Sequence, residues 1–312
     1  MKKTALIIQH FLLPAEMKVL EENFRVIRLW KERDPEATIQ ENKKNIVAVV
    51  SSLLPVSTTL IEALPNLEII ANMAVGVDNI PMDVARARGI AVTNTPDVLT
   101  DDTANVGLSL VLALARRIVE GDMYVRVGKW QNGPLPLGVS LTGKKAGIAG
   151  LGRIGKAVAK RLEAFDMDVV YHGRSKQEDQ PYEYYEDLVE MAKAVDFLVL
   201  CCAGGPETEN LVNYKVLEAL GPKGFLVNIA RGSVVNEEDL LIILRNQGIA
   251  GAGLDVFAAE PHVPEALLTM DNVVLLPHIG SATFETRTEM GQLVVRNLLA
   301  HFDGEPLLTP YQ

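Results

Sequence analysis

The sequence is poor in cysteine, with only Cys201 and Cys202 among its 312 residues. Adjacent residues of a strand point to opposite faces of the sheet, so we expect no disulfide between these two thiols. An inventory this small excludes a fold held together by disulfides and is typical of a reducing compartment. We therefore expect a cytoplasmic protein.

Long apolar runs and excess positive charge are lacking as well. No apolar run approaches the length of a membrane span. The apolar start, Ala5 to Ile8, is broken by Gln9 and His10, which favours a first β-strand over a signal peptide. The net charge of −10 argues against a nucleic-acid surface. We expect neither a membrane nor a nucleic-acid partner, and we assign no metal ligands.

What is present is an ordinary composition for a folded protein, with 48% apolar and 22% charged residues. The length favours two domains. Strand-like runs alternate with helical patterns, which indicates an α/β chain with parallel sheets. The first set of expected strands is 5–8, 26–29, 46–51, 67–71 and 90–93. The second set starts at 146 and continues through 169–171, 195–202, 224–229, 251–256 and 273–276.

Three further segments are expected between and after these sets. Residues 100–120 predict one bridging helix, capped by Thr100 or Asp101 and ended by Gly121. Residues 130–138 predict a loop because they are rich in glycine and proline. Residues 284–302 predict a last helix, and periodicity does not decide which sheet it packs against.

A glycine motif opens the second set: Gly150-Leu151-Gly152-Arg153-Ile154-Gly155, between a strand and a helix. Such glycines permit a tight turn, close approach of the backbone to a pyrophosphate, and close packing of helix on strand. The helix N-terminus offers N–H groups and partial positive charge to that anion. The motif therefore predicts a dinucleotide site.

The next strand should show which dinucleotide binds. NAD sites usually carry Asp or Glu at its end, where this chain has Gly173, followed by Arg174, Ser175 and Lys176. Arg174 can bind a 2′-phosphate with paired donors, a contact worth about 1.5–3 kcal/mol. We therefore predict NADP(H) over NAD(H); the alternative is a solvated basic turn.

Three polar residues follow later strands of the second set: Arg231, Glu260 and His278. Each alone is compatible with a surface or structural role. Ligands of open α/β sheets bind at the carboxyl ends of the strands, so together the three predict an active site beside the cofactor, in a cleft between two lobes. Arg231 would bind the carboxylate of a 2-oxo acid, and His278 would protonate its carbonyl oxygen. Glu260 would favour the protonated imidazole.

Asp255, at the end of another strand, has two interpretations that the sequence leaves open. It either accepts a hydrogen bond from the nicotinamide carboxamide or caps a turn.

At these residues the chain resembles the D-isomer-specific 2-hydroxyacid dehydrogenases. The resemblance covers essentially the whole chain and rests on the glycine motif and six further segments: 74–78, 92–96, 228–232, 253–257, Glu260-Pro261 and 277–280. Residues 97–102 and the turn at Gly173-Arg174-Ser175 make it most similar to the NADPH-dependent glyoxylate/hydroxypyruvate and hydroxyphenylpyruvate reductases.

The resemblance implies a two-domain fold. A Rossmann-type doubly wound sheet (99–284) would bind the dinucleotide and carry a dimerisation arm, and a smaller flavodoxin-like domain (1–98 and 285–312) would bind substrate. It implies catalytic Arg231, Glu260 and His278, and substrate contacts at Leu53, Val75 and Gly76. The implied cofactor contacts are the glycine motif from Gly150 to Gly155, Gly173, Arg174, Ser175 and Lys176, with Thr103, Cys202, Ala203, Pro206, Ile229, Ala230, Asp255 and Gly280.

The resemblance also implies a homodimer in which the arm 121–138, with Trp130, contacts the neighbouring subunit or reaches its site. One departure is the segment 201–206, where relatives carry a Pro-Leu-Thr-like sequence; it affects adenosine contacts rather than chemistry.

The expected reaction is reduction of a 2-oxo acid. Leu53, Leu54 and Met73 would border a pocket for a small or moderately apolar side chain, so glyoxylate and hydroxypyruvate compete with an aryl pyruvate. Two alternatives remain: a dinucleotide-sensing module that binds other proteins, and an NAD-linked dehydrogenase of the phosphoglycerate type.

Overall fold

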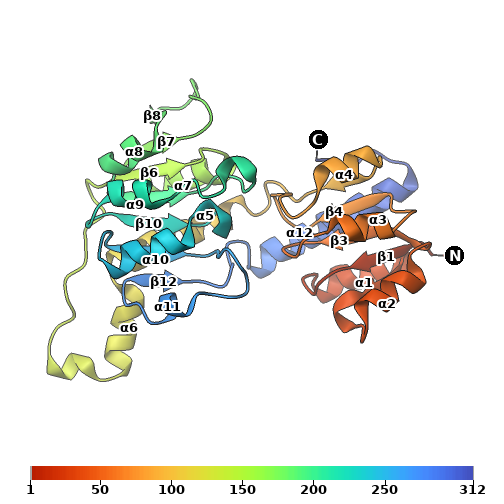
Figure 1. Cartoon of the computed structure of the whole chain (residues 1–312), viewed down its shortest axis with the longest axis horizontal. Helices are drawn as coiled ribbons and strands as arrows, with labels where there is room; N and C mark the ends of the chain where they lie inside the picture. The colour runs from red at the N-terminus through yellow and green to blue at the C-terminus, as the bar shows by residue number, and fades with distance from the viewer. Residues whose placement is uncertain (1, 312) are drawn as a thin grey trace. The chain divides into compact units, whose positions relative to one another are not determined.

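The computed structural model describes residues 2–311, which divide into two compact units (Figure 1). The first unit extends to Leu99 and resumes at Ala282, and the second is Thr100–Ser281. The expected domains had their boundaries at 98/99 and 284/285, and their outermost residues, 1 and 312, lie outside the described part. The assignment of substrate to one unit and dinucleotide to the other stays a prediction.

The first unit contains a five-stranded parallel sheet in the order β2-β1-β3-β4-β5. This is the flavodoxin-like order. Its strands are β1 (Thr4–Ile7), β2 (Arg25–Arg28), β3 (Ile46–Ser51), β4 (Ile69–Asn72) and β5 (Ala91–Thr93), with helices α1 (Pro14–Asn23), α2 (Pro35–Asn42), α3 (Thr58–Ala63) and α4 (Met82–Ala87).

The last helix, α12 (Phe284–Asp303), belongs to this first unit and packs against α1 and β4. Its start is fixed by Thr283, whose hydroxyl accepts the N–H of Thr286 at 3.1 Å. Its end is fixed by Gly304, whose φ of 76° is the left-handed conformation that glycine adopts without strain.

The second unit contains a seven-stranded parallel sheet in the order β12-β11-β10-β9-β6-β7-β8. This is the Rossmann order with one extra strand at the β12 edge. The strands are β6 (Lys145–Ala149), β7 (Asp168–His172), β8 (Glu183–Tyr185), β9 (Phe197–Leu200), β10 (Phe225–Asn228), β11 (Gly251–Leu254) and β12 (Val273–Leu275). The strand order reverses at β6, between β7 and β9, and dinucleotides bind at such a reversal.

Helices cover both faces of this sheet, as expected for a doubly wound fold. Helices α5 (Thr100–Ala115) and α7 (Arg153–Glu163) bury their apolar residues in one core cluster. Helices α8 (Leu188–Ala194), α9 (Tyr214–Leu220) and α10 (Glu237–Arg245) bury theirs in the other, and α11 (Glu265–Leu268) adds Leu267. The predicted α/β class with parallel sheets is therefore confirmed.

The expected strands match the observed ones closely, with one omission. β8 was not predicted, because its three residues, Glu183-Tyr184-Tyr185, are too few and too polar to form an apolar run. The expected strand 195–202 ends at Leu200. Beyond it, Cys201 packs against one core cluster and Cys202 against the other, and both are free thiols, as their opposite orientation predicted.

The expected single helix 100–120 is wrong. Helix α5 ends at Ala115, Arg117 adopts a φ of 54°, and a second helix, α6 (Ile118–Arg126), runs through Gly121 instead of ending there. The prediction failed because the apolar pattern continues across the break between the two helices. In α6 the apolar side chains are exposed rather than buried: Ile118 is 54% and Met123 52% accessible.

After α6, the expected loop 130–138 begins with a short 3-10 turn, Lys129–Asn132, and the chain then returns to the sheet without a helix or strand. The return is fixed where Val139 donates its N–H to Ala115 O at 2.7 Å. Residues 117–138 therefore form a projecting arm, the yellow segment in Figure 1, which begins before the expected 121–138 because α6 starts at Ile118. Within residues 2–311, no helix has the length and apolarity that crossing a membrane requires.

Candidate active site

The glycine turn has the geometry that its sequence predicts. Gly150 adopts a φ of 96°, and a Cβ there would lie 2.6 Å from the backbone of Cys202. A Cβ on Gly155 would collide with Gly150 O, which shows how closely α7 packs on the turn. Gly152, the N-cap of α7, is different: nothing lies within 4 Å of its Cβ position. Packing requires the first and third glycines, whereas the second leaves open space before a helix N-terminus, which fits a pyrophosphate.

The basic turn after β7 is exposed. Arg174, Ser175 and Lys176 are all classed as exposed, and a Cβ on Gly173 would meet nothing within 4 Å. Arg174 Nη1 lies 3.7 Å from Glu207 Oε2, and Lys176 Nζ lies 3.1 Å from Glu178 Oε2. Both pairs are solvent-exposed, so each holds its cation only weakly. The cations therefore remain accessible to an anion.

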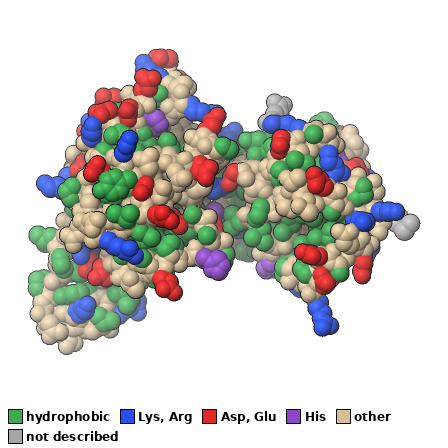
Figure 2. Space-filling model, in the orientation of Figure 1, with side chains coloured by type: hydrophobic (Ala, Val, Ile, Leu, Met, Phe, Trp, Pro, Cys, Tyr) green, Lys and Arg blue, Asp and Glu red, His purple; other side chains and the backbone are tan. Residues whose placement is uncertain are grey.

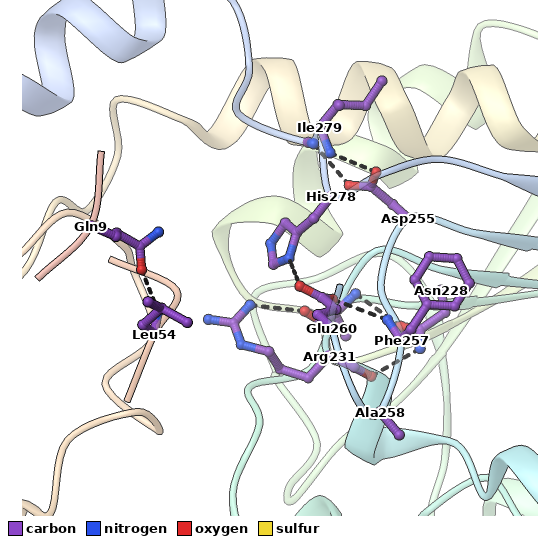
Figure 3. A network of polar contacts seen from close by, with 12 residues as sticks. Gln9, Leu54, Asn228, Arg231, Asp255, Phe257, Ala258, Glu260, His278 and Ile279 are labelled. Carbon is purple, nitrogen blue, oxygen red and sulfur yellow. Dashed lines mark hydrogen bonds and ion pairs between the residues drawn. The ribbon is translucent and has the colours of Figure 1, made fainter. Parts of the chain in front are cut away.

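The predicted catalytic residues come together after neighbouring strands. Arg231 follows β10, Glu260 follows β11 and His278 follows β12, in a sheet where these strands are adjacent. His278 Nδ1 lies 2.7 Å from Glu260 Oε2, and the two side chains are 19% and 28% exposed. The guanidinium of Arg231 points toward the same carboxylate (Figure 3). The structure thus brings all three residues to one place.

The Glu260 carboxylate is positioned and ionised by its neighbours. Its second oxygen accepts the N–H of Phe257 at 3.0 Å. Burial alone would raise the pKa of Glu260, but the hydrogen bond and charge of His278, the Phe257 N–H and the charge of Arg231 together lower it below its ordinary value. Glu260 is therefore an anion near neutral pH, and it orients the imidazole of His278 through Nδ1.

Asp255 supports the loop that carries His278. Its carboxylate accepts the N–H groups of Ile279 at 2.7 Å and Gly280 at 2.8 Å, and its carbonyl accepts the N–H of His278 at 2.8 Å. Burial raises the pKa of Asp255, and these bonds offset only part of the rise. Of the two open interpretations, the turn cap is therefore present, while a contact to nicotinamide stays a prediction.

Asn228 is a supporting residue to which the sequence analysis assigned no role. Its Oδ1 accepts the N–H of Ala230 at 3.0 Å and its Nδ2 donates to Arg231 O at 2.9 Å, so it fixes the backbone that carries Arg231. Its buried position at the end of β10 was the available signal, since a buried amide needs hydrogen-bond partners.

The remaining predicted cofactor residues lie beyond the carboxyl ends of the strands or beside them. Ile229 and Ala230 follow β10, and Cys202, Ala203 and Pro206 follow β9. Thr103, in α5, is close to Gly280: a Cβ on this glycine would lie 3.3 Å from the Thr103 methyl carbon. Burial raises the pKa of Cys202 to about 11, so this thiol stays protonated beside the glycine turn. Arg153 and Ile154 begin helix α7.

Of the predicted substrate residues, Arg231 and His278 are in the second unit, and Leu53, Val75 and Gly76 are in the first. Leu53 and Leu54 are exposed, whereas Met73 is buried in the core and does not border an open surface. The N–H groups of Val75 and Gly76 donate no hydrogen bond to any residue within the described range, while Asn94 and Asn72 hold their carbonyls at 2.9 and 2.8 Å. Two such N–H groups on a fixed loop suit a carboxylate.

A polar network holds the loops that carry these residues. Asn79 donates to Ser52 O at 2.7 Å, and Gln9 Oε1 accepts the N–H of Leu54 at 2.7 Å, a contact drawn in Figure 3. These hydrogen bonds fix the backbone around Leu53 and Leu54 within the first unit.

The second unit, with its Rossmann order and open glycine turn, defines a dinucleotide-binding oxidoreductase domain. The family model for the NAD-binding domain of D-isomer-specific 2-hydroxyacid dehydrogenases matches residues 108–280. The chain belongs to this family, as the sequence motifs predicted, and it is an oxidoreductase.

Individual relatives are similar over nearly their whole length. Hydroxyphenylpyruvate reductase of Plectranthus scutellarioides is 48% identical over 292 residues, 93% of each chain. Glyoxylate/hydroxypyruvate reductase A HPR2 of Arabidopsis thaliana is 47% identical over 292 residues, again 93% of each. Among solved structures, the NADPH-dependent glyoxylate/hydroxypyruvate reductase of Sinorhizobium meliloti, in complex with NADP and malonate, has a TM-score of 0.91 and 42% identity, covering 100% of this chain and 97% of that one.

Proposed function

We propose that this protein catalyses the NADPH-dependent reduction of a small 2-oxo acid to the D-2-hydroxy acid. The observation that carries the proposal is the His278–Glu260 pair at 2.7 Å, on the strand edge that also holds the open glycine turn. When bound, NADPH supplies a hydride to the carbonyl carbon. The relatives named as glyoxylate/hydroxypyruvate and hydroxyphenylpyruvate reductases support this choice.

His278 supplies the proton that the reduced carbonyl oxygen needs. Because Nδ1 is bound to Glu260, Nε2 is the nitrogen left to donate to substrate. The anionic Glu260 stabilises the imidazolium before transfer and orients the neutral ring after it. Arg231 binds the substrate carboxylate with paired donors. In the first unit, the N–H groups of Val75 and Gly76 are available to a carboxylate.

The residues that would hold NADPH are those of the glycine turn and the basic turn. Gly152 and the N-terminus of α7 receive the pyrophosphate, since a Cβ there would meet nothing and the helix N–H groups are available. Arg174, Ser175 and Lys176 are exposed and follow a strand whose end lacks a carboxylate, which favours a 2′-phosphate over a free ribose hydroxyl.

A homodimer in the cytoplasm completes the proposal. The arm 117–138 exposes an apolar surface on α6 and beyond, made of Ile118, Val119, Met123, Val125, Val127, Trp130 and Leu137. An apolar surface of this kind indicates a protein partner, and a second copy of this chain is the partner we propose. The reduced free thiols suit a cytoplasmic location.

The experiment is a panel of 2-oxo acids with both cofactors, followed at the absorbance of the reduced nicotinamide. We expect turnover of glyoxylate, hydroxypyruvate and an aryl pyruvate with NADPH. A catalytic efficiency with NADH equal to or higher than that with NADPH would favour the NAD-linked dehydrogenase instead. Turnover of none, together with intact NADPH binding, would favour the sensing module.

A further inference from the structure

The connection from β7 to β8 differs from the other crossovers of its sheet. It joins two parallel strands with residues 173–182 alone and contains no helix, whereas α7 joins β6 to β7 and α8 joins β8 to β9. A helix fixes its own backbone through repeated hydrogen bonds. This connection has no helix, so it lacks that regular pattern. It also carries Arg174, Ser175 and Lys176. Their placement therefore depends on side chains that hold the loop.

Two tyrosines hold the loop at either end of the basic segment. Tyr184 Oη donates to Gly173 O at 3.0 Å, and Tyr171 Oη accepts the N–H of Gln177 at 2.6 Å. Tyr171 and Tyr184 are paired in register on β7 and β8, so both rings are on the same face, with centroids 5.3 Å apart. Tyr171 is almost wholly buried, which makes this ring pair a rigid support.

The same loop is tied to the glycine turn. Gln177 Nε2 donates to Leu151 O at 3.0 Å, and Gly150 donates its N–H to His172 O at 2.8 Å. The backbone is therefore anchored at 172, 173 and 177, while the three residues between the anchors are exposed. The distance from the pyrophosphate turn to the basic segment is set by these bonds.

We propose that Tyr171, Tyr184 and Gln177 are positioning residues that determine the preference for NADPH over NADH. The proposal rests on the function proposed above, in which the basic segment binds the 2′-phosphate. The covalent structure of NADPH limits the distance between its pyrophosphate and its 2′-phosphate, and ordering the long Arg and Lys side chains costs conformational entropy. A loop held at the matching distance removes part of that cost. NADH has no 2′-phosphate, so its binding does not depend on where the basic segment is held.

The test measures binding rather than activity, in Tyr184→Phe and Gln177→Met. Tyr184→Phe keeps the ring and removes one hydroxyl, and Gln177→Met keeps the side-chain length and removes the donor. The matched control is Tyr182→Phe, because the Tyr182 hydroxyl donates to Glu163 Oε2 at 3.1 Å and, among the described residues, makes no hydrogen bond with the basic segment. Dissociation constants for NADPH, NADH and adenosine 2′,5′-bisphosphate are measured by calorimetry.

We expect NADPH and the bisphosphate to bind about threefold to tenfold more weakly to each variant, as for the loss of one hydrogen bond. NADH should change less than about twofold on the same scale, and the control should match the wild type. Unchanged NADPH preference in both variants would overturn the inference. So would equal weakening of NADPH and NADH, which would make the network a general support of the site.

The wild type separates this inference from the proposed function. If it binds NADH as tightly as NADPH, the proposed cofactor is wrong whatever the variants do. If it prefers NADPH and the variants keep that preference, only the positioning role fails. Thermal unfolding checks that the variants fold, and if Tyr184→Phe does not, the half-buried Gln177 and its variant decide the outcome.

Discussion

At the scale of single residues, His278 combines a strained backbone with a defined partner. Its φ of 53° is a left-handed conformation, which asparagine adopts more readily than other non-glycine residues. His278→Asn therefore removes the acid and disturbs the turn least. We expect kcat to fall by about 10²- to 10⁴-fold, the range for loss of a general acid, while NADPH affinity is retained.

Steady-state kinetics and a binding titration measure the two effects. His262→Asn is the matched control, since His262 is exposed, lies two residues from Glu260 in the sequence, and makes no side-chain hydrogen bond within residues 2–311. A variant of His278 with unchanged kcat would show that another group donates the proton.

The lowered pKa of Glu260 gives a prediction for stability. Burial opposes the charge, but His278, Phe257 and Arg231 outweigh it, so the pKa in the folded chain lies below the ordinary 4.5. A depressed pKa stabilises the fold above the unfolded-state value, and that contribution is lost as pH falls through the folded value. The unfolding midpoint of Glu260→Gln should thus differ most from wild type above about pH 4.5, with the difference shrinking below it. A difference that grows on acidification contradicts this sign.

Gly173 offers a direct change of cofactor preference. Because its Cβ position is open, Gly173→Asp introduces a carboxylate without a clash. The charge should repel a 2′-phosphate and accept hydrogen bonds from ribose hydroxyls, so the ratio of kcat/KM for NADPH over NADH should fall about tenfold to a hundredfold. Gly173→Ala adds a methyl group without charge and should leave the ratio nearly unchanged. A similar fall in both variants would point to bulk rather than charge.

At the scale of elements, the sequence predicted strands better than helix ends. Apolar runs identified every strand except β8, whose polar residues are held by pairing with β7 rather than by burial. The break at Arg117 was not predictable, because periodicity records which side chains are apolar and not whether a surface covers them. Asn228 and Gln177 hold the loops that carry Arg231 and the basic segment through hydrogen bonds to nearby backbone groups, and such bonds leave no spacing pattern in the sequence.

The exposed apolar face of α6 gives a prediction about assembly. Met123→Lys places a charge on this face, where Met123 is 52% exposed, and should weaken the proposed homodimer. Burying an unpaired charge in an interface costs several kcal/mol, enough to shift the dissociation constant by orders of magnitude. Analytical ultracentrifugation over a concentration series measures the shift. Ile242→Lys is the control, because Ile242 is 45% exposed on the outer side of α10. Equal sedimentation of both variants and wild type would exclude α6 from the interface.

At the scale of the whole molecule, the alternation of runs and helices was enough to predict two parallel sheets, because most crossovers between parallel strands contain a helix; the β7–β8 connection is the exception in the second sheet. The two units also predict separable ligand effects in hydrogen exchange. NADPH should slow exchange at the glycine turn and at residues 174–177 of the second unit. Val75 and Gly76, whose N–H groups have no partner among the described residues, should slow further on adding oxalate as a 2-oxo acid mimic. Protection of no second-unit amide by NADPH would contradict the assigned site.

The order of the second sheet separates the determinants of chemistry from those of cofactor choice. Arg231, Glu260 and His278 follow β10, β11 and β12, whereas the basic segment follows β7, and β6 and β9 lie between them. Three strand spacings amount to about 14 Å. Substitutions that far apart usually have additive effects on free energy. In the evolution of proteins with this sheet, substitutions in the loop after β7 can therefore change the cofactor, and substitutions near β10 to β12 can change the substrate, without one cancelling the effect of the other.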